Sequence, residues 1–184
     1  MRIGRLVTFT GGFLLAASGI AGAQEGGKAG ISIGYPSAIG VLWHATETIA
    51  IRPDFNFTHS SSDNTSGWGF GTNISVLFYL KKYDNVRPYV SPRFSYARNS
   101  ATSTPTTSTL PGTTAVPPIT ITASTTGGAG SFGVQAWSGS HFSVFGEVGV
   151  GFSQRSSDTS STTIGVLKSK AWGTTAGVGV VFYP

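Results

Sequence analysis

The sequence predicts an all-β protein, an eight-stranded antiparallel up-and-down barrel that spans a membrane, and three observations support this. Apolar and polar residues alternate along eight segments, and a period of two is that of a β-strand. Charged residues make up only 10% of the chain, against about a quarter of a typical soluble domain. After residue 23, no apolar run reaches the roughly 20 residues that a transmembrane helix needs. Strands are therefore the elements expected to cross the membrane.

The first 23 residues predict a cleaved secretory signal peptide. Arg2 and Arg5 form a positive start, residues 6–20 an apolar core, and Ala21-Gly22-Ala23 a small-residue cleavage site. The remaining residues, 24–184, are expected to form one barrel domain. Their net charge is small and their basic residues are scattered, which argues against a nucleic-acid partner. The absence of cysteine excludes disulfides and thiolate chemistry.

Three strands are predicted first, at residues 28–35, 38–45 and 48–58. Their apolar faces carry Ala29, Ile31, Ile33 and Tyr35, then Ile39, Val41 and Trp43, then Ile49, Ile51, Phe55 and Phe57. In the third strand the opposite face carries Ala50, Arg52, Asp54 and Asn56. Each of these segments is short and has apolar residues at alternate positions, as a strand with one apolar face should have.

The fourth strand, residues 68–80, has the clearest pattern. Its apolar face carries Trp68, Phe70, Thr72, Ile74, Val76, Phe78 and Leu80. Its other face carries Gly69, Gly71, Asn73, Ser75, Leu77 and Tyr79. Thirteen residues is long for a globular strand, but it suits a tilted strand crossing about 30 Å of hydrocarbon.

Four more strands are predicted towards the C-terminus. The fifth, residues 87–98, places Val90, Pro92, Phe94 and Tyr96 outward; Pro88 and Pro92 predict local irregularity because proline lacks a ladder donor. The sixth passes through Phe132, Val134 and Ala136 to Trp137, and residues 119–122 could extend it. The seventh carries Phe142, Val144, Val148, Val150 and Phe152 outward. The eighth carries Trp172, Thr174, Ala176, Val178, Val180 and Phe182 on one face.

The connections alternate in length, as in outer-membrane barrels with short periplasmic turns and longer extracellular loops. Short turns follow the second, fourth and sixth strands, at residues 46–47, 81–86 and 138–141. Longer polar loops are predicted at residues 59–66, 99–124 and 156–165. The first connection, Pro36-Ser37, is short although it should lie outside. It is the single mismatch in the pattern.

A soluble lipocalin-type barrel would also alternate, so the apolar face has to be assigned to lipid or to a cavity. The opposite faces carry charges and glycines, which do not suit an apolar cavity. Aromatic residues near strand ends predict an interfacial girdle, formed by Tyr35, Trp43, Trp68, Phe78, Trp137, Phe142, Trp172 and Phe182. The apolar faces are therefore predicted to meet lipid.

Four charged residues on the inward faces are expected at similar heights in the lumen: Arg52, Asp54, Arg93 and Glu147. A buried charge is costly unless it is paired. We therefore expect a luminal charge network that plugs the barrel, because eight strands enclose a space about wide enough for side chains only. An ion pathway or selectivity site is the functional alternative.

With its signal peptide, eight alternating segments and closing Val178-Gly179-Val180-Val181-Phe182-Tyr183, the chain resembles the small outer-membrane β-barrel family, typified by the membrane domain of outer membrane protein A. The resemblance implies that Phe182 serves as the aromatic signal for the barrel-assembly machinery. The residues Tyr183-Pro184 after it depart from the family pattern. No peptidoglycan-binding domain follows the barrel in this sequence, so the resemblance is to the barrel alone.

A catalytic alternative comes from His59, Ser61 and Asp63 at the predicted extracellular mouth. A histidine base, a serine and an orienting carboxylate could support acyl transfer, and lipid A deacylases of the outer membrane use histidine and serine in a similar spacing. The alternative interpretation is three common polar residues in a Ser-rich loop. His44 and His141 are interpreted as interfacial polar groups, and three separated histidines form no recognisable metal motif.

The sequence thus predicts a monomeric, non-enzymatic barrel of a Gram-negative outer membrane, exported through the periplasm, with a structural or surface-interaction role. The expected partners are outer-membrane lipids, lipopolysaccharide and the assembly machinery, with no cofactor or metal. A lipid A-modifying hydrolase and a narrow porin-like channel remain the alternatives.

Overall fold

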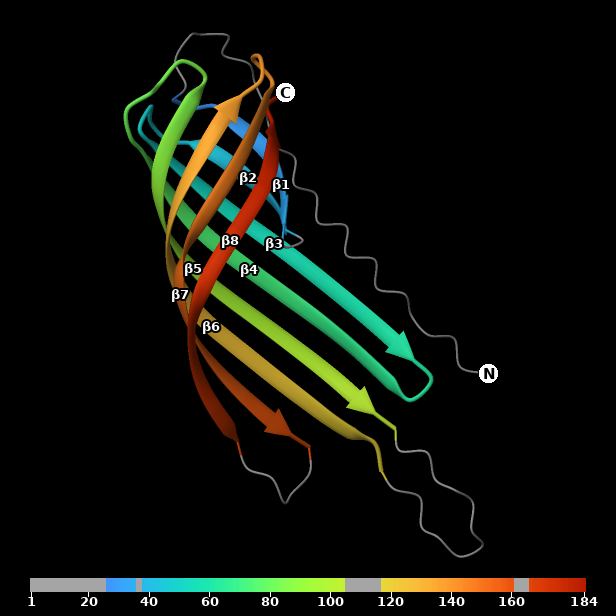
Figure 1. Ribbon diagram of the computed structural model, residues 1–184. Helices are drawn as coiled ribbons and strands as arrows, with labels where there is room; N and C mark the ends of the chain where they lie inside the picture. The colour runs from blue at the N-terminus through green and yellow to red at the C-terminus, as the bar shows by residue number, and fades with distance from the viewer. Residues whose placement is uncertain (1–25, 36–37, 105–116, 161–165) are drawn as a thin grey trace, which may run out of the picture.

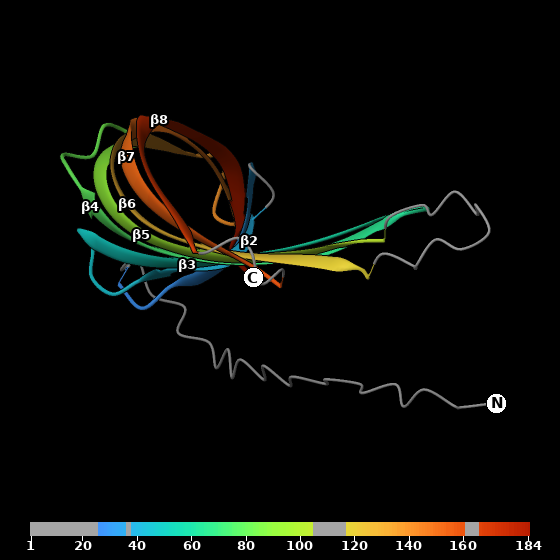
Figure 2. The same cartoon turned by 90° about the horizontal axis from the view of Figure 1, so that it is seen from below.

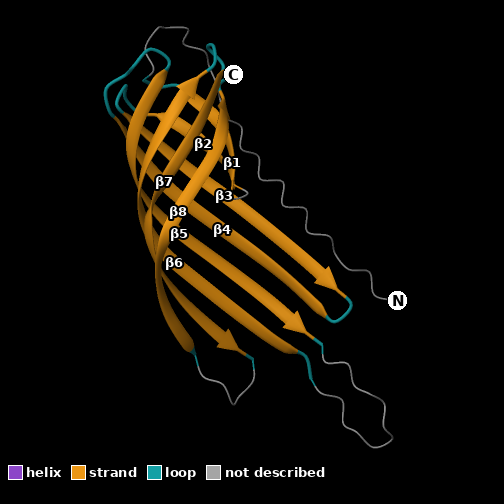
Figure 3. Cartoon of the chain, viewed as in Figure 1, coloured by secondary structure: helices purple, strands orange, loops and turns teal. Residues whose placement is uncertain are grey.

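The structure is a computed structural model that describes residues 26–35, 38–104, 117–160 and 166–184. Eight strands, each hydrogen-bonded to the next in the sequence, form a closed antiparallel barrel, and β8 returns to β1 (Figures 1 and 3). The strands are β1 (Ala29–Tyr35), β2 (Ala38–His44), β3 (Ile49–Ser62), β4 (Thr65–Tyr79), β5 (Val86–Ser103), β6 (Ile119–Trp137), β7 (Phe142–Thr159) and β8 (Leu167–Phe182). The predicted fold class is confirmed. The predicted signal peptide and the Pro36-Ser37 turn lie outside the described residues.

The apolar rows predicted from the sequence form the outer surface of the barrel. Large apolar side chains are exposed on every strand, among them Ile33, Trp43, Phe55, Phe70, Phe94, Phe132, Val148 and Val178. The inward rows hold small, polar, charged and aromatic side chains, with a few aliphatic ones such as Leu42, Leu77 and Val181. A soluble monomer rarely exposes such a continuous apolar surface, so this outer belt is the surface that meets hydrocarbon. Among the described residues, no helix is long and apolar enough to cross a membrane.

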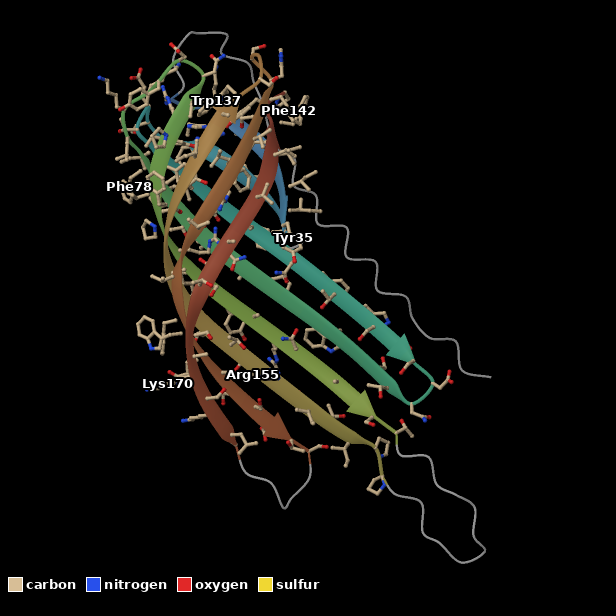
Figure 4. The ribbon with its side chains drawn as sticks, viewed as in Figure 1. Tyr35, Phe78, Trp137, Phe142, Arg155 and Lys170 are labelled. Atoms are coloured by element: carbon tan, nitrogen blue, oxygen red, sulfur yellow. The ribbon has the colours of Figure 1, made fainter. Side chains whose placement is uncertain are left out.

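One member of the predicted aromatic girdle, Trp137, points into the lumen. Trp137 is only partly exposed and packs against the buried residues inside the barrel, whereas Trp43, Trp68 and Trp172 are exposed outside. The reason is its register, because Trp137 lies two residues after the buried Gln135 on β6 and so shares its inward face. Figure 4 shows Trp137 at the same end of the barrel as Phe78 and Phe142.

The barrel has two ends of different character. At the short-turn end lie the turns after β2, β4 and β6 and the C-terminus (Figure 1). At the long-hairpin end, the strands extend well beyond the predicted boundaries. Here β3 ends at Ser62 and β4 begins at Thr65. In the same way β5 ends at Ser103 and β6 begins at Ile119.

Most of the predicted loop at residues 59–66, and parts of those at 99–124 and 156–165, are therefore strand, and their assignment as loops was wrong. The cause is ladder pairing, which continues without interruption to Ser62↔Thr65 and Ser103↔Ile119. Serine and threonine are polar in sequence, yet threonine favours strands and a paired neighbour satisfies the backbone. The predicted extension of the sixth strand through residues 119–122 is confirmed.

Prolines interrupt the ladders without shifting their register. The β4–β5 pairing lacks the pairs Val76↔Pro92 and Leu77↔Ser91 and then resumes in the same register. The β2–β3 pairing has the same kind of gap opposite Pro53. Pro88, by contrast, pairs normally with Val134, so the irregularity expected at Pro88 and Pro92 occurs only at Pro92.

The first hairpin is much shorter than the others. β1 and β2 have 7 residues each, whereas β3 to β8 have 14 to 19. Pairing of β1 with β8 ends at Tyr35↔Val178, and pairing of β2 with β3 ends at Ile39↔Phe55. Beyond these pairs, no described strand lies between β3 and β8, and the longer strands continue as an incomplete wall (Figure 2). β1 and β2 therefore form a shorter part of the barrel wall than the other described strands do.

Candidate functional site in the lumen

The structure brings the four charged residues singled out in the sequence into one group inside the barrel, here called the charge cluster (Arg52, Asp54, Arg93 and Glu147). Arg52 and Asp54 project from β3, Arg93 from β5 and Glu147 from β7, so the cluster spans the lumen. Each occupies an inward position of its strand, and Arg52, Asp54 and Glu147 are buried.

Glu147 is the centre of the charge cluster. Nη2 of Arg52 donates to both of its carboxylate oxygens, at 2.9 and 3.0 Å. Arg93 donates from Nη2 to the same carboxylate, and the Tyr89 hydroxyl donates to Oε2 at 3.1 Å. One acid therefore compensates two guanidinium groups from different strands, with a hydroxyl completing its hydrogen bonds.

Asp54 and the remaining contacts complete the compensation of charge. Asp54 Oδ2 lies 3.3 Å from Arg52 Nε, and Ser32 Oγ donates to Asp54 Oδ1 at 3.3 Å. Arg93 Nε donates to Ser75 Oγ at 2.9 Å. The Arg52 guanidinium carbon also lies 4.5 Å from the centre of the Phe145 ring. Two positive and two negative groups are balanced, as burial away from water requires.

A second layer of side chains lies between the charge cluster and the short-turn end, and we call it the floor (His44, Tyr79, Gln135 and Tyr183). His44 Nε2 and the Tyr183 hydroxyl are 2.9 Å apart. Gln135 Nε2 donates to that hydroxyl at 3.1 Å and to Ser143 Oγ at 2.7 Å, and the Tyr79 hydroxyl donates to Gln135 Oε1. All four residues are buried.

Aromatic packing connects the two layers. The His44 and Tyr79 rings stack with centroids 5.5 Å apart, and the Tyr79 and Tyr89 rings meet edge to face at 5.7 Å. Since Tyr89 also donates to Glu147, hydrogen bonds and ring contacts run continuously from the charge cluster to Tyr183. Over this length the lumen is filled by polar and aromatic side chains together with buried apolar ones such as Leu42, Leu77 and Val181.

Sequence reasoning missed the floor. His44 was predicted to be an interfacial group, but it is buried inside the barrel, because the even positions of β2 face inward. Tyr183 looked like a departure after the terminal Phe182, yet its backbone N–H donates to the His141 carbonyl at 2.8 Å, which extends the ladder by one residue. The signal that could have shown this is alternation, since Val181 and Tyr183 share the inward face while Phe182 is exposed to the outside.

Two cavities lie on opposite sides of these layers. One, of about 180 Å³, lies at the short-turn end and is lined by His44, Trp137, Tyr183 and polar turn residues. The other, of about 220 Å³, lies above the charge cluster and is lined partly by Arg93, Asn56 and Asn73. The floor and the charge cluster stand between the two cavities.

The structure places the three candidate catalytic residues at the long-hairpin end. His59 and Ser61 are exposed on β3, opposite Trp68 and Ser66 of β4, and Asp63 lies in the tight turn that follows. Within the described part of the chain, no hydrogen bond joins His59 to Ser61 or Asp63. Among the described residues, no group of histidine and carboxylate side chains is arranged to hold a metal ion.

Comparisons with known proteins concern the fold. Neither the protein-family models nor the curated protein sequences include a match to this chain. Among solved structures, a major outer membrane protein from Thermus thermophilus is similar, with a TM-score of 0.50 and 14% identity over 85% of this chain and 98% of that one.

Two further solved structures are CarO and CarO2 of Acinetobacter baumannii. CarO has a TM-score of 0.44 and 13% identity over 86% of this chain and 98% of its own. CarO2 has a TM-score of 0.43 and 14% identity over 85% and 97%. The assignment of the fold rests on the Thermus structure and on the strand order: the chain has the eight-stranded barrel fold of an outer-membrane protein.

Proposed function

We propose that this chain is a monomeric, non-enzymatic barrel of the bacterial outer membrane, closed to passage through its lumen, that presents its long hairpins at the cell surface. The short-turn end lies in the periplasm and the long-hairpin end outside, in accord with the usual placement of short turns and long loops. Phe182 serves as the assembly signal, with its side chain outside the barrel, where a partner could reach it.

The main support for a closed lumen is that Glu147 bridges opposite walls of the barrel. Its carboxylate, on β7, binds Arg52 of β3 and Arg93 of β5, and the floor lies directly beneath. Removing either partner would leave an uncompensated buried charge, which is costly in a lumen shielded from solvent. A layer held by such contacts is a stable obstruction rather than a selectivity site.

A conductance measurement tests this proposal. The protein, inserted into planar lipid bilayers, is expected to give no discrete current steps, while a porin in the same bilayers serves as the positive control. Reproducible steps that scale with the number of inserted molecules would contradict the closed lumen and favour the narrow channel.

The hydrolase alternative is tested separately by incubating the bilayer-inserted protein with lipid A. We expect no release of acyl chains. Release that is abolished by His59→Ala and by Ser61→Ala would favour an enzyme and overturn the non-enzymatic proposal.

A further inference from the structure

The outward positions of β5 to β8 are uncharged over a common length and then become cationic towards the long-hairpin end. The uncharged lengths are residues 86–96, 126–136, 142–152 and 172–182. Each fits the roughly 9–11 residues of a strand that crosses the hydrocarbon. On β8 the next outward residues are Lys170 and Lys168, and on β5 the next is Arg98. These three cations therefore lie just beyond the hydrocarbon layer.

The strand register joins these cations in a lateral row. Arg98 pairs with Ser124 of β6, which pairs with Ser156 of β7. Ser156 in turn pairs with Lys168 of β8. We call these four residues the outer row. Adjacent strands lie about 4.8 Å apart, so the two cationic ends of the outer row are separated by roughly 14 Å along the sheet.

The next row towards the membrane joins the outer row to the apolar belt. It consists of Tyr96, Thr126, Gln154 and Lys170, each paired with the next. Directly below it lies an aromatic pair, Phe152 and Trp172, whose ring centroids are 5.0 Å apart. Trp172 is 79% exposed on the outside of the barrel. Apolar, amphipathic and cationic rows thus follow one another in the order in which acyl chains, interface and headgroups meet a barrel.

Neighbouring acids do not neutralise the positive charge of this surface. Among the described residues, Arg98, Lys168 and Lys170 form no ion pair, and all three are exposed. The one acid at a described outward position of β5 to β8 is Asp158, which lies one row further from the membrane. Unneutralised cations beside a bilayer attract anionic headgroups.

The cations gather on one side of the barrel. On β3 and β4, the first outward residues beyond Phe57 and Trp68 are His59 and Ser66. No described outward residue of these two strands is lysine or arginine. The cationic surface is therefore confined to β5–β8, as expected of a binding site rather than of a uniform ring around the barrel.

From these observations we infer that the outer face of β5 to β8 binds a lipid of the outer leaflet whose broad sugar headgroup carries two phosphates, the chemistry of lipid A. The planar guanidinium of Arg98 holds one phosphate, and Lys168 with Lys170 holds the other. The serine hydroxyls of the outer row face the sugars, and the acyl chains lie along the aromatic pair. A headgroup with one phosphate would leave one end of the outer row unneutralised. The inference rests on the proposed orientation of the barrel and deepens the proposed function by naming a lipid and its site.

A competition measurement tests the inference. Lipid A labelled on an acyl chain with an acceptor for tryptophan fluorescence is titrated into phosphocholine vesicles that hold the protein. We expect saturable energy transfer, which unlabelled lipid A reverses. Lipid A with one phosphate removed and phosphatidylglycerol should each compete at least about tenfold less well, because each leaves one cationic end unneutralised. Absence of saturable transfer, or equal competition by all three lipids, would overturn the inference.

Charge-removing variants locate the site. Arg98→Gln and the double variant Lys168→Gln/Lys170→Gln each remove one cationic end and should each weaken lipid A binding at least about tenfold. The matched control is Arg155→Gln. Arg155 pairs with Ser169, at the height of the two lysines, but it lies on the inner face of β7, so this variant should bind as the parent does. Figure 4 shows Arg155 and Lys170 at a similar height, towards the long-hairpin end.

Two outcomes would count against the site itself. Equal loss of binding in Arg155→Gln would mean that overall charge, rather than the outer face, attracts the lipid. Unchanged binding in both the Arg98 and the lysine variants would exclude the outer row as the site. Conductance is measured independently, so a closed lumen without lipid A binding would contradict only this inference, and an open lumen with intact binding would contradict only the proposed function.

Discussion

The two halves of the barrel share the same antiparallel pairing but are stabilised differently. In the short-turn half all eight strands are paired, and the charge cluster and the floor fill the interior. In the long-hairpin half only β3 to β8 continue, most side chains are at least partly exposed, and serine and threonine dominate. The ladder is the same in both halves. The difference teaches that backbone pairing alone can extend a strand, whereas packing of side chains in the lumen determines where the interior of the barrel is filled.

The largest test of this comparison removes the central acid of the filled half. Glu147→Leu leaves Arg52 and Arg93 without their shared carboxylate, and breaking a buried pair costs about 3–5 kcal/mol. We expect a loss of this size in the free energy of unfolding, measured by urea titration in lipid vesicles. Glu47→Gln, at an exposed turn position, should change it by less than about 0.5 kcal/mol. Equal stability of both variants would show that the cluster does not support the closed half.

The second test concerns the floor. Tyr183→Phe removes the hydroxyl that accepts from Gln135 and contacts His44, and we expect a loss of about 1–3 kcal/mol in the same titration. Tyr35→Phe is the matched control, because the Tyr35 side chain is exposed, and it should have no measurable effect. If the two variants lost the same amount, burial in the floor would not be what makes Tyr183 important.

In the long-hairpin half, effects should be smaller. The hydroxyls of Thr102 and Thr120 are 2.9 Å apart across β5 and β6, and a cross-strand pair of this kind contributes about 0.2–1 kcal/mol. A double-mutant cycle with Thr102→Ala and Thr120→Ala should give a coupling energy in this range. A coupling above about 2 kcal/mol would mean that this half contributes to stability as the filled half does.

The smallest effect on stability is expected at the tip of the β3–β4 hairpin. An epitope inserted between Asp63 and Asn64 should leave folding unchanged, since loop tips tolerate insertion. Antibody should bind it on intact cells. The same epitope at Gly139, in the turn after β6, should be accessible only after permeabilisation. The reverse pattern would invert the proposed orientation.

The sequence predicted the strands best where one face met lipid. Alternation assigned the outward and inward rows of β3 and β4 correctly, because a period of two is independent of what a strand pairs with. It failed at the long-hairpin end, at residues 60–62 of β3 and 99–103 of β5, where small and polar residues form no apolar row and only pairing extends the strands. It also misjudged Trp137 and His44. Their residue types and their positions near strand ends suggested the membrane interface, and only their register on β6 and β2 places their side chains in the lumen.

Composition and periodicity by themselves determined the fold class, the number of strands and the inward placement of Arg52, Asp54, Arg93 and Glu147. These follow from local rules: side chains alternate, and charges avoid hydrocarbon. Only the tertiary structure decided that two arginines share Glu147 and that Tyr183 belongs to the floor. It also decided that pairing of β1 with β8 ends at Tyr35↔Val178. Those features depend on the relative register of strands far apart in the chain, and register is a property of the closed barrel rather than of any one segment.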